Sequence, residues 1–121
     1  MVILHQSQIS AVITFSYTTS RGPHPEMTVL LIHIPETYTL KYTFRIQRTS
    51  TATTPGTFGI RFYLNEIKKD ELLSTENRNS FTTFKVSSIQ VTPGDEIRVT
   101  TSDTSSGGAT NQSIYLQLFK L

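Results

Sequence analysis

Three histidines are the residues of this chain best suited to bind a metal, but their spacing does not favour a metal site. His5, His24 and His33 stand 19 and 9 positions apart on separate predicted segments. Zinc sites usually combine closely spaced histidine and cysteine ligands, and this chain has no cysteine. We therefore expect neither a metal nor a cofactor. The lack of cysteine also excludes disulfide bonds.

Acid–base or nucleophilic catalysis would require a carboxylate or a hydroxyl group beside a positioned partner. Asp95, Glu96 and Asp103 come closest, since they surround one predicted strand, but turns and strand ends commonly carry such residues; a weak calcium site is the alternative. The chain contains 20 threonines and 13 serines, none in a Gly-x-Ser-x-Gly nucleophile motif. We expect no catalytic residue and a protein that is not an enzyme.

A basic strand face is the next candidate for function. Lys41 and Arg45 share the polar side of one predicted strand, and Arg61 or Arg98 could join them from neighbouring strands. Single-stranded nucleic acid would also need exposed aromatic rings on the same face. The alternation puts the three aromatic residues of that strand on the opposite side, and the net charge is only +2. We therefore expect no nucleic-acid partner.

Carbohydrate binding remains an alternative, because sugars commonly bind to exposed aromatic side chains. The chain has no tryptophan, and Tyr17, Tyr63 and Tyr115 are the tyrosines that the pattern leaves for the surface. Tyr63 shares its strand face with Arg61. The predicted ligand-binding residues are Tyr63, Arg61, Lys41 and Arg45.

These residues must be positioned by β-strands, because alternation of apolar and polar residues dominates the chain. The predicted strands span residues 9–17, 27–34, 38–47, 58–64, 67–73, 81–86 with 89–91, 97–99 and 114–121. A break in parity at Ser87 and Ser88 suggests a bulge or a change of sheet. No segment has the spacing of a long helix. The pattern predicts one all-β domain over residues 1–121, a two-layer antiparallel β-sandwich of jelly-roll type.

The same pattern separates core from loop. The predicted core residues are Leu40, Phe44, Phe62 and Ile97. Arg48–Thr57 and Thr101–Asn111 are long polar segments, which we expect to be mobile surface loops. The N-terminal residues lack the basic start and apolar stretch of a secretory signal, and no apolar run approaches the roughly 20 residues that span a bilayer. We expect a complete, unexported and soluble product without membrane insertion.

Apolar residues on both sides of two strands predict self-association. A strand in a two-layer sandwich has one inner face, so its other side should be polar. The predicted interface residues are Tyr115, Phe119, Leu121, Met27, Val29 and Leu31. If these two strands were neighbours in one sheet, they would expose several hundred Å² of apolar surface, which soluble monomers seldom leave uncovered. We therefore expect a homo-oligomer.

The C-terminal third has a sequence pattern that resembles that of a known group of domains. Residues 88–99 lead through Pro93-Gly94-Asp95 into a strand, and the aromatic strand 113–119 ends the domain. This resembles the closing strands of trimeric jelly rolls of the tumour-necrosis-factor and complement-globular-head type, which also occur in phage and viral head or fibre proteins. Residues 62–65 look like the mid-domain strand and turn of that group, which usually continues with glycine where this chain has Glu66.

The resemblance implies a role as well as a fold. It implies a homotrimer and a non-enzymatic structural or attachment module, such as a capsid, decoration or fibre-head domain of a virion. The implied partners are further copies of the chain, other virion proteins or a cell-surface glycan. A carbohydrate-binding β-sandwich of the lectin type is the alternative.

Overall fold

Strands form where polar and apolar residues alternate, and they occupy most of the chain that the structure describes. The computed structural model describes residues 2–3, 12–48, 56–75, 82–105 and 110–121. Within these residues there are nine strands and no helix. The strands are β1 (Val2–Ile3), β2 (Val12–Arg21), β3 (His24–His33), β4 (Tyr38–Arg48), β5 (Phe58–Leu64), β6 (Ile67–Ser74), β7 (Thr82–Val91), β8 (Glu96–Asp103) and β9 (Thr110–Lys120).

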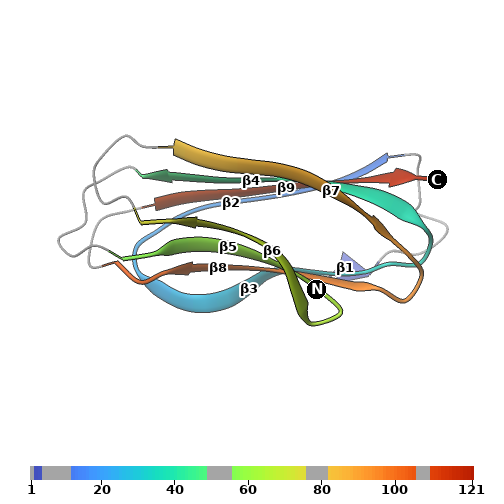
Figure 1. Cartoon of the computed structure of the whole chain (residues 1–121), viewed down its shortest axis with the longest axis horizontal. Helices are drawn as coiled ribbons and strands as arrows, with labels where there is room; N and C mark the ends of the chain where they lie inside the picture. Colours follow the sequence, from blue (N-terminus) through green and yellow to red (C-terminus); the bar gives the residue numbers. More distant parts are fainter. Residues whose placement is uncertain (1, 4–11, 49–55, 76–81, 106–109) are drawn as a thin grey trace.

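The strands are arranged in two sheets packed face to face (Figure 1). One sheet has the order β2-β9-β4-β7, and the other has the order β1-β3-β8-β5-β6. All pairings are antiparallel except that of the two-residue β1, which runs parallel to β3. Consecutive strands lie in different sheets apart from β5 and β6, as in an eight-stranded jelly roll. The predicted all-β, two-layer antiparallel jelly roll is confirmed.

The space between the sheets is filled by the inward side chains of every long strand. All four predicted core residues are fully or almost fully buried: Leu40, Phe44, Phe62 and Ile97. The Tyr42 ring stacks on Phe44 with centroids 4.9 Å apart and meets Phe62 edge-on at 5.1 Å. β4 therefore supplies the middle of the core, and its aromatic residues face inward as predicted.

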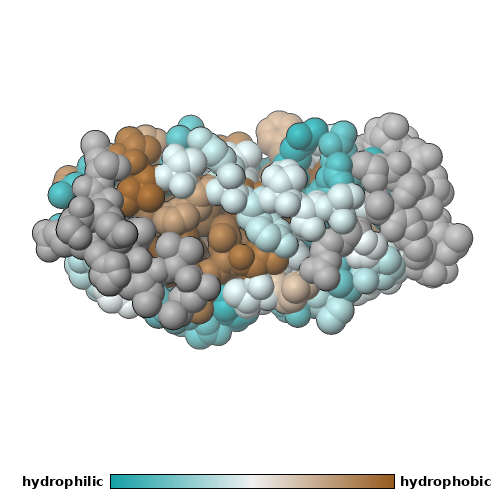
Figure 2. All heavy atoms as spheres, turned by 180° about the vertical axis from the view of Figure 1, so that it is seen from behind, coloured by the Kyte–Doolittle hydropathy of each residue, from teal (hydrophilic) through white to brown (hydrophobic). Residues whose placement is uncertain are grey.

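The core reaches the surface along the seam between β2 and β3. Ile13, Phe15 and Tyr17 of β2 and Val29 and Leu30 of β3 are partly buried and pack against the core. Seen from this side, hydrophobic residues gather in the middle of the molecule, with polar residues above and below them (Figure 2). Tyr17 therefore belongs to the core side of its strand and is not one of the outward tyrosines.

The predicted break in β7 does not exist. β7 pairs with β4 residue for residue from Thr82 to Val91, without a register shift. Outward and inward residues alternate throughout β7. Phe84 and Val86 therefore point outward, and Lys85 points toward the other sheet, where it pairs with Asp70. An edge strand tolerates this arrangement because an inward lysine there can reach an acidic partner.

The two strands predicted to share an apolar surface lie in different sheets. β9 belongs to the four-stranded sheet and β3 to the five-stranded sheet. Register shifts in β3 place both Met27 and Leu30 opposite core-facing residues of β8, and Val29 packs against the core. Leu31 alone of the three predicted β3 residues pairs on the outer side, opposite Arg98. The bulges thus account for apolar residues on both parities, and the six predicted interface residues do not form one surface.

The two predicted polar loops are shorter than expected, because strands extend into them. Arg48 is a buried residue of β4; its guanidinium lies 4.7 Å from the centroid of the Phe58 ring and donates a hydrogen bond to Thr110 Oγ1 at 3.0 Å. Thr101 to Asp103 belong to β8 and are buried as well. Residues 49–55 and 106–109 lie outside the described residues. Polar composition was misleading here, since hydrogen bonding allows polar side chains to be buried at this end of the sandwich.

Two tight turns at the other end agree with the sequence. Asn65 and Glu66 connect β5 to β6 with φ angles of 53° and 65°, the left-handed conformations that a two-residue hairpin requires. Gly94 has a φ of 89° in the turn before β8, closed by a hydrogen bond from the Asp95 amide to the Thr92 carbonyl at 3.1 Å. Asn65 Nδ2 donates to Asp95 Oδ1 at 2.9 Å, so the two turns are fastened to each other.

Truncating Leu40 or Phe62 to alanine should lower the free energy of unfolding by about 2–5 kcal/mol, because each leaves a cavity in a fully packed core. Thr39→Ala, on the outer side of the same strand as Leu40, should change it by less than about 0.5 kcal/mol. Urea denaturation measures both. Similar losses for the two kinds of variant would show that the strand faces are assigned wrongly.

Candidate functional site

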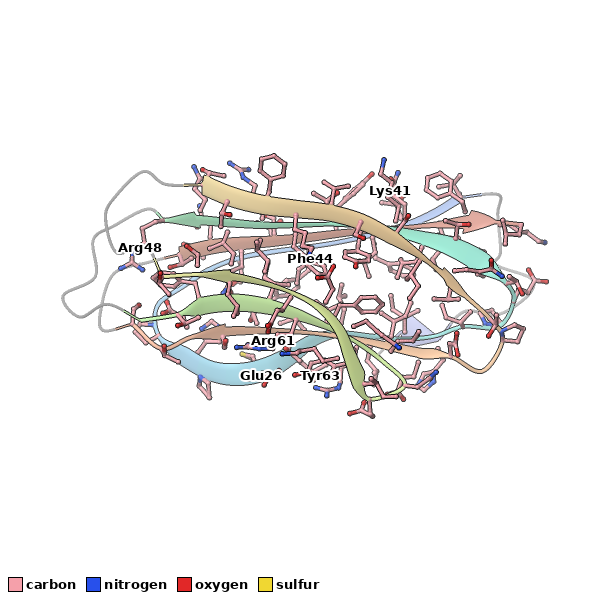
Figure 3. The ribbon with its side chains drawn as sticks, in the orientation of Figure 1. Glu26, Lys41, Phe44, Arg48, Arg61 and Tyr63 are labelled. Carbon is pink, nitrogen blue, oxygen red and sulfur yellow. The ribbon has the colours of Figure 1, made fainter. Side chains whose placement is uncertain are left out.

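The four predicted ligand-binding residues do not meet, because they lie on opposite sides of the sandwich. Lys41 and Arg45 are exposed on the outer side of β4, in the four-stranded sheet. Arg61 and Tyr63 are on the outer side of β5, in the five-stranded sheet. Figure 3 shows Lys41 pointing away from the molecule on one side and Arg61 and Tyr63 on the other, with Phe44 between the sheets. Arg98 likewise cannot join Lys41.

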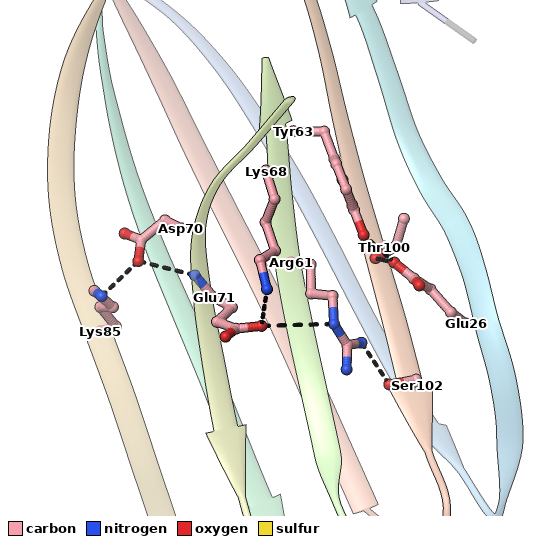
Figure 4. Close-up of polar contacts among 9 residues, drawn as sticks. All are labelled: Glu26, Arg61, Tyr63, Lys68, Asp70, Glu71, Lys85, Thr100 and Ser102. Carbon is pink, nitrogen blue, oxygen red and sulfur yellow. Dashed lines mark hydrogen bonds and ion pairs between the residues drawn. The ribbon is translucent and has the colours of Figure 1, made fainter. Parts of the chain in front are cut away.

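On the outer side of the five-stranded sheet, the Tyr63 hydroxyl is part of a hydrogen-bond network centred on Glu26. Its hydroxyl donates to Glu26 Oε2 at 2.6 Å, and Thr100 Oγ1 donates to the same oxygen at 2.7 Å (Figure 4). These two hydrogen bonds, that from Tyr63 first, lower the pKa of Glu26 against the opposing effect of its burial. The Arg98 guanidinium lies 4.2 Å from the centroid of the Tyr63 ring and covers one of its faces.

The neighbouring charges of this face are paired in the same way. Arg61 donates to Ser102 Oγ at 2.7 Å and lies 3.7 Å from Glu71, which also binds Lys68 at 3.0 Å (Figure 4). Arg98 forms two hydrogen bonds to the Glu66 carboxylate, at 3.1 and 2.9 Å. The predicted ligand residues Arg61 and Tyr63 are thus engaged in contacts between strands.

Asp70 joins the edges of the two sheets. Its carboxylate accepts a hydrogen bond from the Tyr42 hydroxyl at 2.5 Å and pairs with Lys85 at 2.5 Å. Burial, and then the hydrogen bond to Asp70, raise the pKa of Tyr42 to about 12. Burial of Asp70 disfavours its charged form, but the hydrogen bonds from Lys85 and Tyr42 outweigh this and lower its pKa.

The residues first considered for metal binding and catalysis are separated. His24, at the start of β3, hydrogen bonds to the Gly22 carbonyl and to Thr101 Oγ1, each at 3.0 Å. His33, at the end of β3, lies 3.8 Å from Glu96 of β8. His5 lies outside the described residues. Among the residues that the structure describes, no group of three or more histidine, aspartate or glutamate side chains could hold a metal ion.

Asp95 and Asp103, two of the three carboxylates considered for catalysis, have separate structural contacts. Asp95 closes its turn, where the Asn65 side chain and then the Thr92 amide lower its pKa. Asp103 is buried at the far end of β8 and accepts hydrogen bonds from the Ser105 amide and hydroxyl, at 2.9 and 2.6 Å. Asp95 and Asp103 therefore lie at opposite ends of β8 and cannot act together as an acid–base pair.

The outer side of the four-stranded sheet has a different composition, and we call it the hydroxyl face. The continuous registers of β2, β9, β4 and β7 place every second residue on it. Its members are Val12, Thr14, Ser16, Thr18 and Ser20 of β2; Asn111, Ser113, Tyr115, Gln117 and Phe119 of β9; Thr39, Lys41, Thr43, Arg45 and Gln47 of β4; and Thr82, Phe84, Val86, Ser88 and Gln90 of β7. None of these residues is acidic.

Exposed apolar side chains interrupt this polar surface. Phe84 is 68% exposed and Tyr115 41% exposed. Phe84 pairs with Arg45, and Tyr115 pairs with Thr43 from the other side of β4. The sequence identified Tyr115 as exposed but missed Phe84, because the supposed bulge obscured the parity of β7. A strictly alternating reading of residues 82–91 would have placed Phe84 outward.

Comparison with known proteins gives little beyond this geometry. No protein-family model matches the chain, and no curated protein matches it. Among solved structures, it is similar to one described as "Structure of infectious bursal disease virus Gx strain", with 11% sequence identity and a TM-score of 0.45. The match covers 89% of this chain and 32% of that chain, so the chain spans about a third of its length. In the described residues, no helix is long and apolar enough to cross a membrane.

Replacing Glu26 with glutamine should make the protein less sensitive to acid. The lowered pKa of Glu26 means that its ionised form stabilises the fold above the unfolded-state value of about 4.3, and that this contribution disappears as pH falls through the lower folded value. Between neutral pH and about pH 3, Glu26→Gln should therefore lose less stability than the unchanged protein. Urea midpoints at the two pH values measure this, with Tyr63→Phe expected to shift in the same direction. An unchanged acid sensitivity in both variants would show that the ionised Glu26 carboxylate does not stabilise the fold.

Proposed function

We propose that this chain is a non-enzymatic structural module of a virion, of the capsid, decoration or fibre-head kind, that assembles with further copies of itself. The observation on which this rests is the exposed apolar end of the last strand. Tyr115 and Phe119 lie on the hydroxyl face, and Leu121, directly after β9, is 70% exposed. Phe119 is flanked across the sheet by Val12, which is 44% exposed. Association would remove this surface from water.

The contacts of the polar residues support a structural role. Four of the residues that first suggested chemistry bind neighbouring strands and turns: His24 binds Thr101, Asp95 binds Asn65, Asp103 binds Ser105 and Tyr63 binds Glu26. Such contacts hold the sandwich together. Eight-stranded jelly rolls occur in viral capsid and lectin domains, which agrees with the virion assignment at the level of fold.

A homotrimer is the assembly we propose, since in the trimeric jelly rolls that the sequence resembles the sheet containing the last strand packs around a threefold axis. Residues of β3 are not part of this interface: Val29 packs against the core, and Leu31 faces the opposite side of the molecule. The carbohydrate-binding alternative is less well supported, because Arg98 covers the Tyr63 ring that a sugar would need.

Light scattering coupled to gel filtration tests the proposal. The protein should elute with about three times the chain mass of 13.6 kDa at micromolar concentration. Phe119→Asp should convert it to the monomer, because a carboxylate in an apolar interface is strongly unfavourable without a partner. Leu73→Asp is the matched control, since Leu73 is exposed on β6 of the other sheet. A mass of 13.6 kDa for the unchanged protein, or equal effects of the two variants, would refute self-assembly through this surface.

A further inference from the structure

We propose that the β4–β7 half of the hydroxyl face binds single-stranded nucleic acid, with Lys41 and Arg45 contacting phosphates and Phe84 stacking on a base. This goes beyond the proposed structural role and is centred on a different part of the face, with Tyr115 at the border between the two regions. Along β4, Arg45 is six residues from Thr39, the residue that pairs with Phe119. At about 3.3 Å per residue this places Arg45 and its neighbour Phe84 about 20 Å along the strand from Phe119, whereas Lys41 is about 7 Å from it.

The first support comes from the cations themselves. Elsewhere in the described residues, most cations lie within ion-pair distance of a carboxylate, as Arg61, Lys68, Lys85, Arg98 and Lys120 do. The exposed Lys69 of β6 is an exception. Lys41 and Arg45 have no such partner among the described residues, and Arg45 donates only to Gln47 Oε1, at 3.1 Å. The hydroxyl face carries these two cations and no acidic residue, so its charge favours the approach of a polyanion.

The second support is the position of the aromatic rings. Phe84 pairs with Arg45, and Tyr115 pairs with Thr43, which lies midway between Lys41 and Arg45. Rings from two neighbouring strands therefore flank the strand that carries both cations. Exposed rings beside cations are what single-stranded binding requires, since bases stack on the rings while the backbone contacts the charges. β7 and β9 supply the rings that β4 by itself does not, which removes the first of the two reasons for expecting no nucleic-acid partner; the second was the net charge of +2.

The geometry of the surface also fits this ligand. Four-stranded antiparallel sheets with exposed aromatic residues are an established platform for unpaired bases. Lys41 and Arg45 are four residues apart on one strand, a distance of about 13 Å, so one extended strand of nucleic acid can contact both. Hydroxyl and amide groups of Thr43, Ser88 and Gln90 lie on the same side and can donate hydrogen bonds.

A sulfated polysaccharide is the competing ligand, since it would use the same two cations. It would not need Phe84, however, whose ring has no polar group and is the most exposed aromatic side chain among the large hydrophobic residues of the described chain. Stacking on a planar base gives that ring a function. The dependence of binding on Phe84 therefore distinguishes the two ligands.

Fluorescence anisotropy of a labelled oligothymidylate, titrated with the protein at about 50 to 200 mM salt, is the test. Two phosphate contacts predict a slope of about −1.4 for the logarithm of the binding constant against that of the salt concentration. Lys41→Gln or Arg45→Gln should reduce the slope to about −0.7. Phe84→Ser should weaken binding at least about fivefold without changing the slope.

Matched controls come from the other sheet. Lys69→Gln removes an exposed cation and Ile67→Ser an exposed apolar side chain, both from β6, and neither should alter binding. Phe119→Asn should weaken self-association but, because it adds no charge beside Lys41, should leave oligothymidylate binding at Phe84 within about threefold, which separates this inference from the proposed function. Failure to bind at low salt would overturn the inference. So would equal losses in the controls, or binding of dextran sulfate that depends on Lys41 and Arg45 but not on Phe84.

Discussion

The unbroken antiparallel pairing of β4 with both β7 and β9 is the constraint on which the rest of the structure depends. It runs the length of all three strands without a bulge, so the inward and outward sides of each strand are set together. Inward, it collects Leu40, Phe44 and their neighbours into the middle of the core. Outward, it forms the hydroxyl face. A shift of one residue in either pairing would exchange these two sets of side chains.

The two sheets differ in the regularity of their strand pairing and in the charges on their outer surfaces. The five-stranded sheet has register shifts in both β3–β8 and β5–β6 pairings and an outer surface whose charges are paired between strands, as Arg61 is with Glu71 and Arg98 with Glu66. The four-stranded sheet is regular and carries hydroxyl groups, two cations and exposed rings. Charges that neutralise each other are of little use for recognition, whereas uncompensated ones attract a ligand. Both proposed interactions therefore belong to the regular sheet.

Polar residues inside the sandwich act mainly as connections. Asp70 links the two sheets at their β6 and β7 edges by contacting both Tyr42 and Lys85. Arg48 occupies the far end, where its guanidinium lies over Phe58 and reaches Thr110. Asp70 and Arg48 each have side-chain hydrogen-bond partners, which offset part of the cost of removing polar groups from water. These contacts join residues that lie 10 to 62 positions apart in the sequence.

The amino-acid sequence by itself determined most of the strands, the class of fold and the apolar core, because alternation with a period of two is a local property of the chain. Leu40, Phe62 and the aromatic residues of β4 could be assigned to the core for this reason. Only the tertiary structure decided which strands are neighbours. It placed Lys41 and Arg61 on opposite sides of the sandwich, separated β3 from β9, and brought Phe84 of β7 beside Arg45 of β4. Pairing between distant strands depends on the packing of the whole core and on charge partners such as Asp70 and Lys85, and no local pattern records it.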